Sequence, residues 1–298
     1  MRKVFIETIL DYSNNNQTPF LLTGDLGYSV LEPFKEKYPD SFINVGIMEQ
    51  SMMSVAAGIS SQNRKVFAYS IANFATFRAL EQLRLDIGYH NLDVCVVGVG
   101  TGFQYGSAGY SHWAVEDLAI VSGLEKFRIY SPADAISTKN IVLDFLNNGG
   151  PKYIRLGKYT KNLSEIYHCE DFGLHVRLFG KGKKIFLSHG SIAIKILESE
   201  FFNTDDYALL VFDEIPALFD KLYLKIFEQA ESIKVLEDVV YTGSLGSRVT
   251  RFMVENKLNK PFKWVGVNGR NISSAGGSEE YLRSRELGFN YLKDLFKD

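Results

Sequence analysis

The stretch Asn44-Val45-Gly46-Ile47-Met48-Glu49-Gln50 precedes a run of small and apolar residues, positions 54–59, that is typical of a buried helix. It therefore places one carboxylate, that of Glu49, at the start of an apolar helix. Burying an unpaired charge is costly, and an apolar setting raises the proton affinity of a carboxylate, which suits a catalytic base. A glutamate that only interacts with the positive end of the helix dipole would leave the same pattern. The spacing alone leaves both interpretations open.

Short apolar segments alternate with amphipathic segments on both sides of this stretch. The pattern predicts strands at residues 20–23, 65–69, 94–97 and 153–156, and helices near residues 3–12, 48–60, 74–90, 114–122 and 134–147. Such alternation favours right-handed βαβ units and a parallel sheet with helices on both faces. We therefore expect residues 1–160 to form one α/β domain.

The alternation resumes in the second half of the chain after a break. Residues 161–183 are charged and glycine-rich, and we interpret them as a linker. Strands are predicted at residues 185–187, 208–212, 232–237 and 264–267, with helical segments between them. Residues 184–298 are thus expected to form a second, smaller α/β domain.

Composition and charge narrow the classes of function. The chain has 298 residues, of which 46% are hydrophobic and 23% charged, as in a globular protein with an ample core. A net charge of −2 gives no reason to expect nucleic acid or an anionic membrane as a partner. No segment approaches the length of a membrane span, and no signal-peptide stretch follows Met1. Cys95 and Cys169 lack metal-ligand spacing, and a cytoplasmic protein is the simplest expectation.

Residues 2–158 resemble the pyrimidine-binding domain of transketolases, which are enzymes that use thiamine diphosphate. The resemblance implies that Glu49 contacts a ring nitrogen of the cofactor's pyrimidine and favours the tautomer that removes the reactive proton. In the second half, residues 235–238 and the glycine-rich turn at residues 243–247 resemble the C-terminal domain of the same family. The fold implied is a pyrimidine-binding parallel-sheet domain followed by a smaller transketolase C-terminal domain.

Two aromatic residues follow Glu49 on the predicted helix 74–90. Phe74 and Phe77 are spaced i, i+3, and such a pair usually belongs to a core. The resemblance implies instead that Phe74, and secondarily Phe77, stacks on the aminopyrimidine ring. Ile71 stands where the family has a further aromatic residue and would keep that wall apolar. Asp25 matches an aspartate of the same domain and is a further candidate for cofactor binding.

One half of the family's cofactor site has no counterpart in this sequence. Transketolases hold the diphosphate and a divalent cation with a separate domain carrying Gly-Asp-Gly and a later asparagine, oxygen ligands that suit Mg²⁺ or Ca²⁺. The nearest string here, Gly24-Asp25-Leu26-Gly27, lacks the second half of that motif, so no metal ligand is assigned to this chain. The resemblance implies the C-terminal subunit of a split transketolase. A separate N-terminal subunit would bind the diphosphate and the metal, in an α2β2 heterotetramer.

The segment from Gly109 to Asp117 resembles the loop that places a histidine over the donor sugar. By sequence alone, His112 would equally cap or pack against the helix that follows. The resemblance implies that His112 hydrogen-bonds the donor's oxygens, and it makes this residue a candidate for proton transfer. Three further residues match positions that grip a sugar phosphate in the family, and guanidinium groups suit phosphate well. They are Arg2, Ser29 and Arg155.

Two departures set the chain apart from ordinary transketolases. Ala108 stands where the family has an aspartate that reads a donor hydroxyl, and Gly100 stands where it has a histidine near the substrate phosphate. Losing polar contacts in one pocket changes which sugars are accepted. We expect transfer of a two-carbon ketol unit from a ketose or ketose phosphate to an aldehyde, in a specialised sugar pathway. The alternatives are a decarboxylating relative, of the deoxyxylulose-phosphate synthase or 2-oxoacid dehydrogenase β type, and a non-catalytic scaffold subunit.

Overall fold

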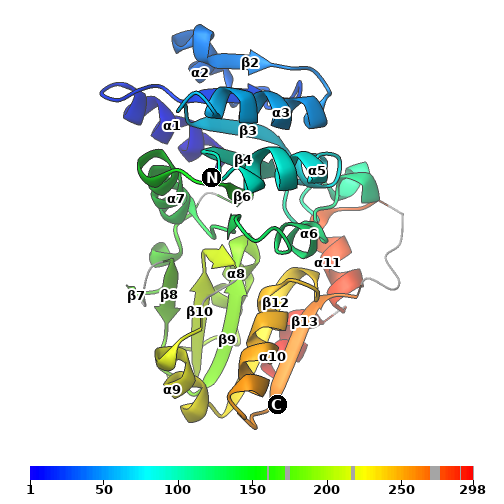
Figure 1. Ribbon diagram of the computed structural model, residues 1–298. Helices are drawn as coiled ribbons and strands as arrows, with labels where there is room; N and C mark the ends of the chain where they lie inside the picture. The colour runs from blue at the N-terminus through cyan, green and yellow to red at the C-terminus, as the bar shows by residue number, and fades with distance from the viewer. Residues whose placement is uncertain (160, 172–174, 216–218, 269–275, 289, 298) are drawn as a thin grey trace.

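Two β-sheets, each covered by helices, make up the protein (Figure 1). The computed structural model describes residues 1–298 except 160, 172–174, 216–218, 269–275, 289 and 298. A seven-stranded sheet has the order β11-β5-β6-β4-β3-β1-β2, and a six-stranded sheet has the order β13-β12-β9-β10-β8-β7. We call the part built on each sheet the first and the second unit. The predicted α/β fold with two sheets is confirmed.

The first sheet is parallel except for its edge strand β11, which pairs antiparallel with β5. All four strands predicted in this half are present. The apolar run of β4 is buried along its whole length, as a strand covered by helices on both faces requires. The strands are β1 (Phe20–Thr23), β2 (Phe42–Asn44), β3 (Val66–Ile71), β4 (Val94–Val99), β5 (Arg128–Tyr130), β6 (Lys152–Leu156) and β11 (Glu214–Ile215).

Helices of the first unit cover both faces of its sheet (Figure 1). The single helix predicted at residues 74–90 is instead three consecutive segments, α4, α5 and a π-helical turn. The helices are α1 (Arg2–Ser13), α2 (Glu32–Lys37), α3 (Glu49–Ser60), α4 (Ala72–Phe77), α5 (Leu80–Gln82), the π-helical turn η2 (Leu83–Tyr89), α6 (Asp117–Val121) and α7 (Ala135–Asn148). Short 3₁₀ turns lie at Pro39–Ser41, Gly106–Ala108 and Tyr110–His112.

The second sheet is mixed. Its strands β13, β12, β9 and β10 are parallel, whereas β10, β8 and β7 pair antiparallel. The strands are β7 (Cys169–Asp171), β8 (Val176–Phe179), β9 (Lys184–His189), β10 (Tyr207–Phe212), β12 (Ser232–Val240) and β13 (Phe262–Val267). The helices are α8 (Ala193–Leu197), α9 (Lys221–Gln229), α10 (Leu245–Glu255), α11 (Glu279–Leu287) and α12 (Tyr291–Phe296), with 3₁₀ turns at Leu163–Glu165 and Gly190–Ile192.

The stretch predicted to be a linker differs from that expectation. Residues 161–183 contain β7 and β8, which hydrogen-bond to the second sheet, while residues 172–174 lie outside the described part of the chain. The strands escaped prediction because they are short and lie between charged and glycine-rich residues. The boundaries proposed for the two domains stay a prediction.

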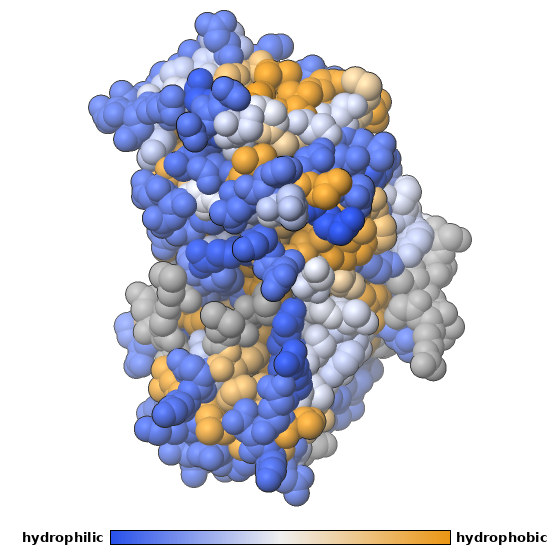
Figure 2. Space-filling view, viewed as in Figure 1, coloured by the Kyte–Doolittle hydropathy of each residue, from blue (hydrophilic) through white to orange (hydrophobic). Residues whose placement is uncertain are grey.

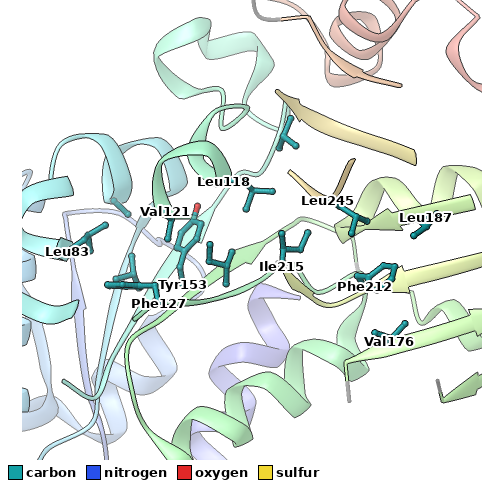
Figure 3. Close-up of a cluster of buried hydrophobic side chains, with 14 of the residues drawn as sticks. Leu83, Leu118, Val121, Phe127, Tyr153, Val176, Leu187, Phe212, Ile215 and Leu245 are labelled. Atoms are coloured by element: carbon teal, nitrogen blue, oxygen red, sulfur yellow. The ribbon is translucent and has the colours of Figure 1, made fainter. Parts of the chain in front are cut away.

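One hydrophobic cluster extends across both units (Figure 3). Leu118, Val121 and Phe127 of the first unit belong to the same buried cluster as Phe212 and Leu245 of the second. The strand β11, which comes from the second half of the sequence, completes the edge of the first sheet. The units are therefore packed against each other, not strung on a free connection. Within the described residues, no helix is long and apolar enough to cross a bilayer.

Candidate active site

Glu49 is the first residue of α3 and lies near the carboxyl ends of the parallel strands of the first sheet. The chain leaves β2 at Asn44 and enters the helix at Glu49, which is only 3% exposed. Ser70 Oγ, on β3, donates a hydrogen bond to Glu49 Oε1 (3.2 Å), and Arg78 Nη1 donates to Oε2 (3.0 Å). The carboxylate is thus buried, as its sequence context predicts. It is paired with a cation from the segment after α4, which the sequence did not indicate.

The Arg78 guanidinium also covers Phe74. Its Cζ lies 3.7 Å from the centre of the Phe74 ring, and the His112 ring meets the same phenylalanine edge to face, with ring centres 4.9 Å apart. Phe74 is half-buried, whereas Phe77 is 46% exposed. Arg78 therefore contacts both Glu49 and Phe74, and Phe74 in turn contacts His112, whereas Phe77 is exposed.

His112 is held by the helix α4 across from it. Asn73 Nδ2 donates to the carbonyl of Ser111 (2.8 Å), and Ser111 Oγ lies 2.9 Å from His112 Nδ1. The side-chain amide oxygen of Asn73, Oδ1, is buried and has no hydrogen-bond partner in the protein. Ile71 is half-buried at the end of β3, directly before α4, and lies at the N-cap of that helix.

Asp25 shapes the loop that follows β1. It adopts φ 58°, and its carboxylate accepts hydrogen bonds from Asn44 Nδ2 (2.9 Å) and the Tyr28 hydroxyl (3.1 Å). These bonds, that from Asn44 first, lower the pKa of Asp25. Asn44 Oδ1 in turn accepts from the backbone N–H groups of Asp25 and Gly46, both at 3.0 Å. Asp25 thus ties the first loop to the stretch that leads into Glu49.

Arg2 and Ser29, two of the three predicted phosphate-gripping residues, lie near the carboxyl ends of the strands. Burial raises the pKa of Tyr69, on β3, and the nearby Arg2 guanidinium acts in the opposite direction. Ser29 is exposed, adopts φ 64°, and donates its backbone N–H to Glu32 Oε1 (2.8 Å). Both side chains stay candidates for contacting a substrate.

The third residue of that set, Arg155, is occupied inside the protein. It is 1% exposed, and it donates two hydrogen bonds to the Asp117 carboxylate, at 2.7 and 3.2 Å, and one to the carbonyl of Ala114 (3.0 Å). Tyr153 donates to the same carboxylate (2.6 Å). A buried charge is retained only when paired, and Asp117 fills that need. Arg155 is therefore paired inside the protein, and its contact with a sugar phosphate stays a prediction.

The two departures lie close to the His112 loop. Gly100 has φ +82°, and a Cβ there would lie 2.0 Å from the ring of Tyr105, so that tyrosine fills the place of a larger side chain. Lys158 Nζ lies 4.7 Å from the centre of the Tyr105 ring and donates to the carbonyl of Gln104 (2.8 Å). Ala108 is exposed on the 3₁₀ turn Gly106–Ala108.

Residues 1–161, which include Glu49, Phe74 and His112, match the family described as "Transketolase, pyrimidine binding domain". The chain belongs to this transketolase family.

Several relatives extend the match beyond that domain. This transketolase-family chain is 27% identical to a putative transketolase C-terminal section of Methanocaldococcus jannaschii, over 95% of the chain and 90% of the relative. It is 25% identical to one subunit of an apulose-4-phosphate transketolase of Phocaeicola vulgatus, over 93% and 90%. A 6-deoxy-6-sulfo-D-fructose transketolase subunit of a Clostridium strain is 29% identical over 96% and 89%.

A solved structure shows the same whole-chain likeness. It is described as a split gene transketolase in an inactive β4 tetramer, and it is 27% identical, with a TM-score of 0.80 over 99% of this chain and 96% of that one. The expectation of a transketolase-type transferase subunit, the C-terminal section of a split enzyme, is thereby confirmed at the level of the family. The relatives differ in the sugars they are named for, so they leave this chain's substrate open.

No cluster of three or more histidine, cysteine or acidic side chains suited to a metal occurs among the described residues. Among the residues of this site, Arg78 and Tyr105 were not predicted from the sequence. Both act through contacts with residues distant in sequence or through space left by a glycine, and neither leaves a local motif.

Proposed function

We propose that this chain is the C-terminal subunit of a two-chain, thiamine-diphosphate-dependent transketolase that transfers a two-carbon ketol unit from a ketose to an aldehyde. The observation that supports this most directly is the continuous series of contacts from Glu49 through Arg78 and Phe74 to His112. The likeness to transketolase subunits of similar length, over most of this chain, points the same way.

Arg78 provides a test of whether the site fits the pyrimidine half of the cofactor. Its guanidinium is flat, directs N–H groups at the Glu49 carboxylate and covers the Phe74 ring. An aminopyrimidine is likewise flat and carries N–H groups on its edge, and aromatic faces bind both kinds of group. The residues therefore fit the pyrimidine, with Arg78 as its stand-in. In this proposal Arg78 swings away when the cofactor binds.

The chemistry that thiamine diphosphate supplies when bound is a carbon nucleophile that can break and form bonds next to a carbonyl. Glu49 would hold a proton against a pyrimidine nitrogen, because its carboxylate is buried and its second oxygen is fixed by Ser70. Phe74 would orient the ring. Ser111 Oγ lies within hydrogen-bonding distance of His112 Nδ1, so Nε2 is the ring nitrogen that would hydrogen-bond an oxygen of the donor sugar.

The diphosphate and the metal are proposed to lie on an N-terminal partner subunit, because this chain carries neither the motif nor a cluster for them in its described residues. A surface suited to that partner borders the site. We call it the assembly face, and its members are 40–75% exposed hydrophobic side chains. Figure 2 shows hydrophobic surface over the part of the first unit where Figure 1 labels α3 and α5. Its residues are Ile47, Met48, Val55, Phe77, Leu85 and Tyr89.

Covering this face would also dry the site. Ile47 and Met48 directly precede Glu49, and Phe77 directly precedes Arg78. Glu49 is already buried, so a partner packed there would remove water chiefly from Arg78 beside it, whose side chain is 45% exposed. Excluding water from the site strengthens its electrostatic interactions. The single chain would then be inactive, and an assembly with two copies of each subunit would carry the activity.

The substrate is proposed to differ from the usual pentose phosphates. Tyr105 fills the place next to Gly100, Arg155 is paired internally, and Ala108 offers no polar group. Arg2, Ser29 and Lys158 are left to meet the distal end of a sugar. A specialised donor is therefore favoured, and the relatives named for unusual sugars are consistent with that view.

Native mass spectrometry tests this proposal directly. The chain would be measured alone and co-expressed with a candidate N-terminal partner, in each case with thiamine diphosphate and Mg²⁺. We expect the cofactor to be retained only by the mixed assembly, which would then be screened for two-carbon transfer from a panel of ketoses and ketose phosphates. Cofactor retained by the lone chain would refute the proposal that this chain carries only half of the cofactor site. Release of carbon dioxide from pyruvate by the mixed assembly, without ketol transfer, would favour a decarboxylating relative.

A further inference from the structure

The segment that carries His112 is a closed loop that rests on the second unit. Gly102 and Ala114 exchange backbone hydrogen bonds at 3.1 and 2.9 Å, which ties the two ends of the loop together. Between them the backbone runs through two 3₁₀ turns, Gly106–Ala108 and Tyr110–His112. Internal hydrogen bonds, such as that from His112 N–H to the Gly109 carbonyl (3.0 Å), stabilise this conformation of the loop.

A separate hydrophobic cluster lies beneath this loop. Phe103 and Trp113 of the loop, and Val115 directly after it, are fully buried, and they pack with Val267 of β13 and Leu282 of α11. The Phe103 and Trp113 rings meet edge to face, with centres 5.4 Å apart. The apolar base of the loop is therefore completed by the second unit, which contributes no residue to the Glu49–Phe74–His112 group.

Backbone contacts fix the loop at two points. The N–H of Val240, at the end of β12, donates to the carbonyl of Val115 (2.8 Å), and the N–H of Gly277 donates to the carbonyl of Gly106 (3.1 Å). At Gly106 a Cβ would lie 2.4 Å from Leu282 and 2.5 Å from the Gly277 carbonyl. The loop backbone thus touches the start of α11 so closely that only glycine fits.

A buried ion pair anchors α11 beneath the same loop. Arg283 donates to Asp238 Oδ2 (3.1 Å) and pairs with Glu279 (2.7 Å), and Arg283 and Asp238 are each 4% exposed. Burial opposes ionisation of Asp238, but Arg283, then Arg155, lower its pKa overall. A Cβ at Gly102, which has φ +56°, would lie 2.2 Å from Asp238 Oδ2. The ion pair therefore packs directly against one end of the loop.

We propose that the second unit is the support, or seat, that fixes the position of the His112 loop. In this proposal Arg283 and Asp238 are positioning residues for His112. The inference rests on the proposed function only in giving His112 a catalytic task. Removing one partner leaves a buried charge unpaired, which is strongly destabilising locally. The start of α11 would then detach from Gly106, and His112 would lose its fixed place opposite Phe74. A misplacement of about 1 Å is enough to slow a reaction on the order of 10²-fold.

Hydrogen exchange of the full chain, followed by mass spectrometry, tests the seat without any need for activity. In Arg283→Met and in Gly106→Ala, we expect the amides of residues 102–115 to exchange at least about tenfold faster than in the parent, since their protection depends on the seat. Arg283→Lys should restore part of the protection. Arg251→Met is the matched control, because it removes an exposed pair with Glu255 on α10. Unchanged loop protection in both test variants would overturn the proposal.

Kinetics of the assembled enzyme supply the second readout. We expect kcat to fall on the order of 10²-fold in Arg283→Met, with the half-saturation concentration of thiamine diphosphate within about twofold of the parent, because Glu49 and Phe74 are not touched. An equal loss of cofactor binding, with faster exchange across the whole chain, would show general unfolding and count against a positioning role. If the parent assembly shows no ketol transfer, the proposed function fails, and the exchange result still decides whether the second unit seats the loop.

Discussion

Glu49 differs from an ordinary helix-start glutamate in being buried and bound by two donors. Ser70 and Arg78 hold its two oxygens in different directions. Glu49→Gln keeps the shape of the side chain but removes the ability to hold a proton. We expect kcat of the assembled enzyme to fall about 10²-fold or more, as for loss of a group in general acid–base catalysis. Steady-state kinetics with saturating cofactor measures the change.

The control for this substitution is Glu81→Gln. Glu81 is an exposed glutamate on α5 that pairs with Arg84, outside the group around Phe74. It should leave kcat unchanged. Activity of Glu49→Gln within about threefold of the parent would remove Glu49 from the catalytic residues, and would revive the interpretation that it only caps the helix.

Arg78 competes with the cofactor if it stands in for the pyrimidine. When a binding site is open for only a fraction of the time, the apparent dissociation constant of its ligand is the intrinsic constant divided by that fraction. Arg78→Met should therefore lower the half-saturation concentration of thiamine diphosphate, by about threefold or more. Titration of the assembly, followed by protein fluorescence, measures it. Arg84→Met, in the following π-helical turn, is the matched control, and weaker binding in Arg78→Met would show that Arg78 supports the bound ring instead.

The sequence singled out candidate residues at the boundaries of predicted elements. Glu49, Phe74 and His112 each begin or border a helix or turn, and the structure places all three together. Arg155 also ends a predicted strand, yet its guanidinium is taken by Asp117 from another element. Pairings of this kind depend on contacts across the fold, and no local pattern carries them.

At the scale of elements, short segments were hardest to predict. β2, β5 and β11 have two or three residues each, too few to show a period. The π-helical turn η2 was predicted as a continuation of one helix, because its apolar spacing is compatible with either geometry. The long buried strands and the helices α1, α3 and α7 were predictable because their apolar period is sustained.

Arg177 joins two elements that belong to different units. From β8 it donates to Asp134, the N-cap of α7, and to Asp213 after β10 (3.4 Å). Burial raises the pKa of Asp213 to about 6, against the attraction of Arg177. The folded protein therefore holds this proton more tightly than the unfolded chain does from about pH 4 to pH 6. Across that window Asp213 makes the free energy of unfolding decrease as the pH rises.

Asp213→Asn removes this opposing contribution. We expect the Tm of the variant to rise more between pH 4 and pH 6 than the Tm of the parent, because the remaining carboxylates act alone. Thermal unfolding followed by circular dichroism at a series of pH values gives both curves. Asp205→Asn, at an exposed pair with Lys181, serves as the control and should leave the curve parallel to the parent. A parallel curve for Asp213→Asn as well would show that Asp213 is ionised throughout this range.

For the whole molecule, the assembly face carries the clearest expectation. Hydrophobic patches at this exposure are costly on an isolated chain and mark interaction sites. Val55 on α3 and Leu85 on η2 lie on neighbouring segments, since Ser54 Oγ donates to Asp86 Oδ2 (2.7 Å). A double substitution, Val55→Asp with Leu85→Asp, would bury two unpaired carboxylates in any complex formed there. We expect assembly with the N-terminal partner to weaken at least about tenfold, while the lone chain keeps the Tm of the parent.

Analytical ultracentrifugation of the mixed subunits over a range of concentrations measures this loss. Val254→Asp on α10 is the matched control, because Val254 is 72% exposed but lies on the second unit, away from the assembly face. Since the proposed cofactor site is shared between chains, cofactor retention should fall with assembly in the double variant and stay intact in the control. Normal assembly of the double variant would move the interface elsewhere. The half of the cofactor site proposed for this chain would then have to be completed from a different face of the chain.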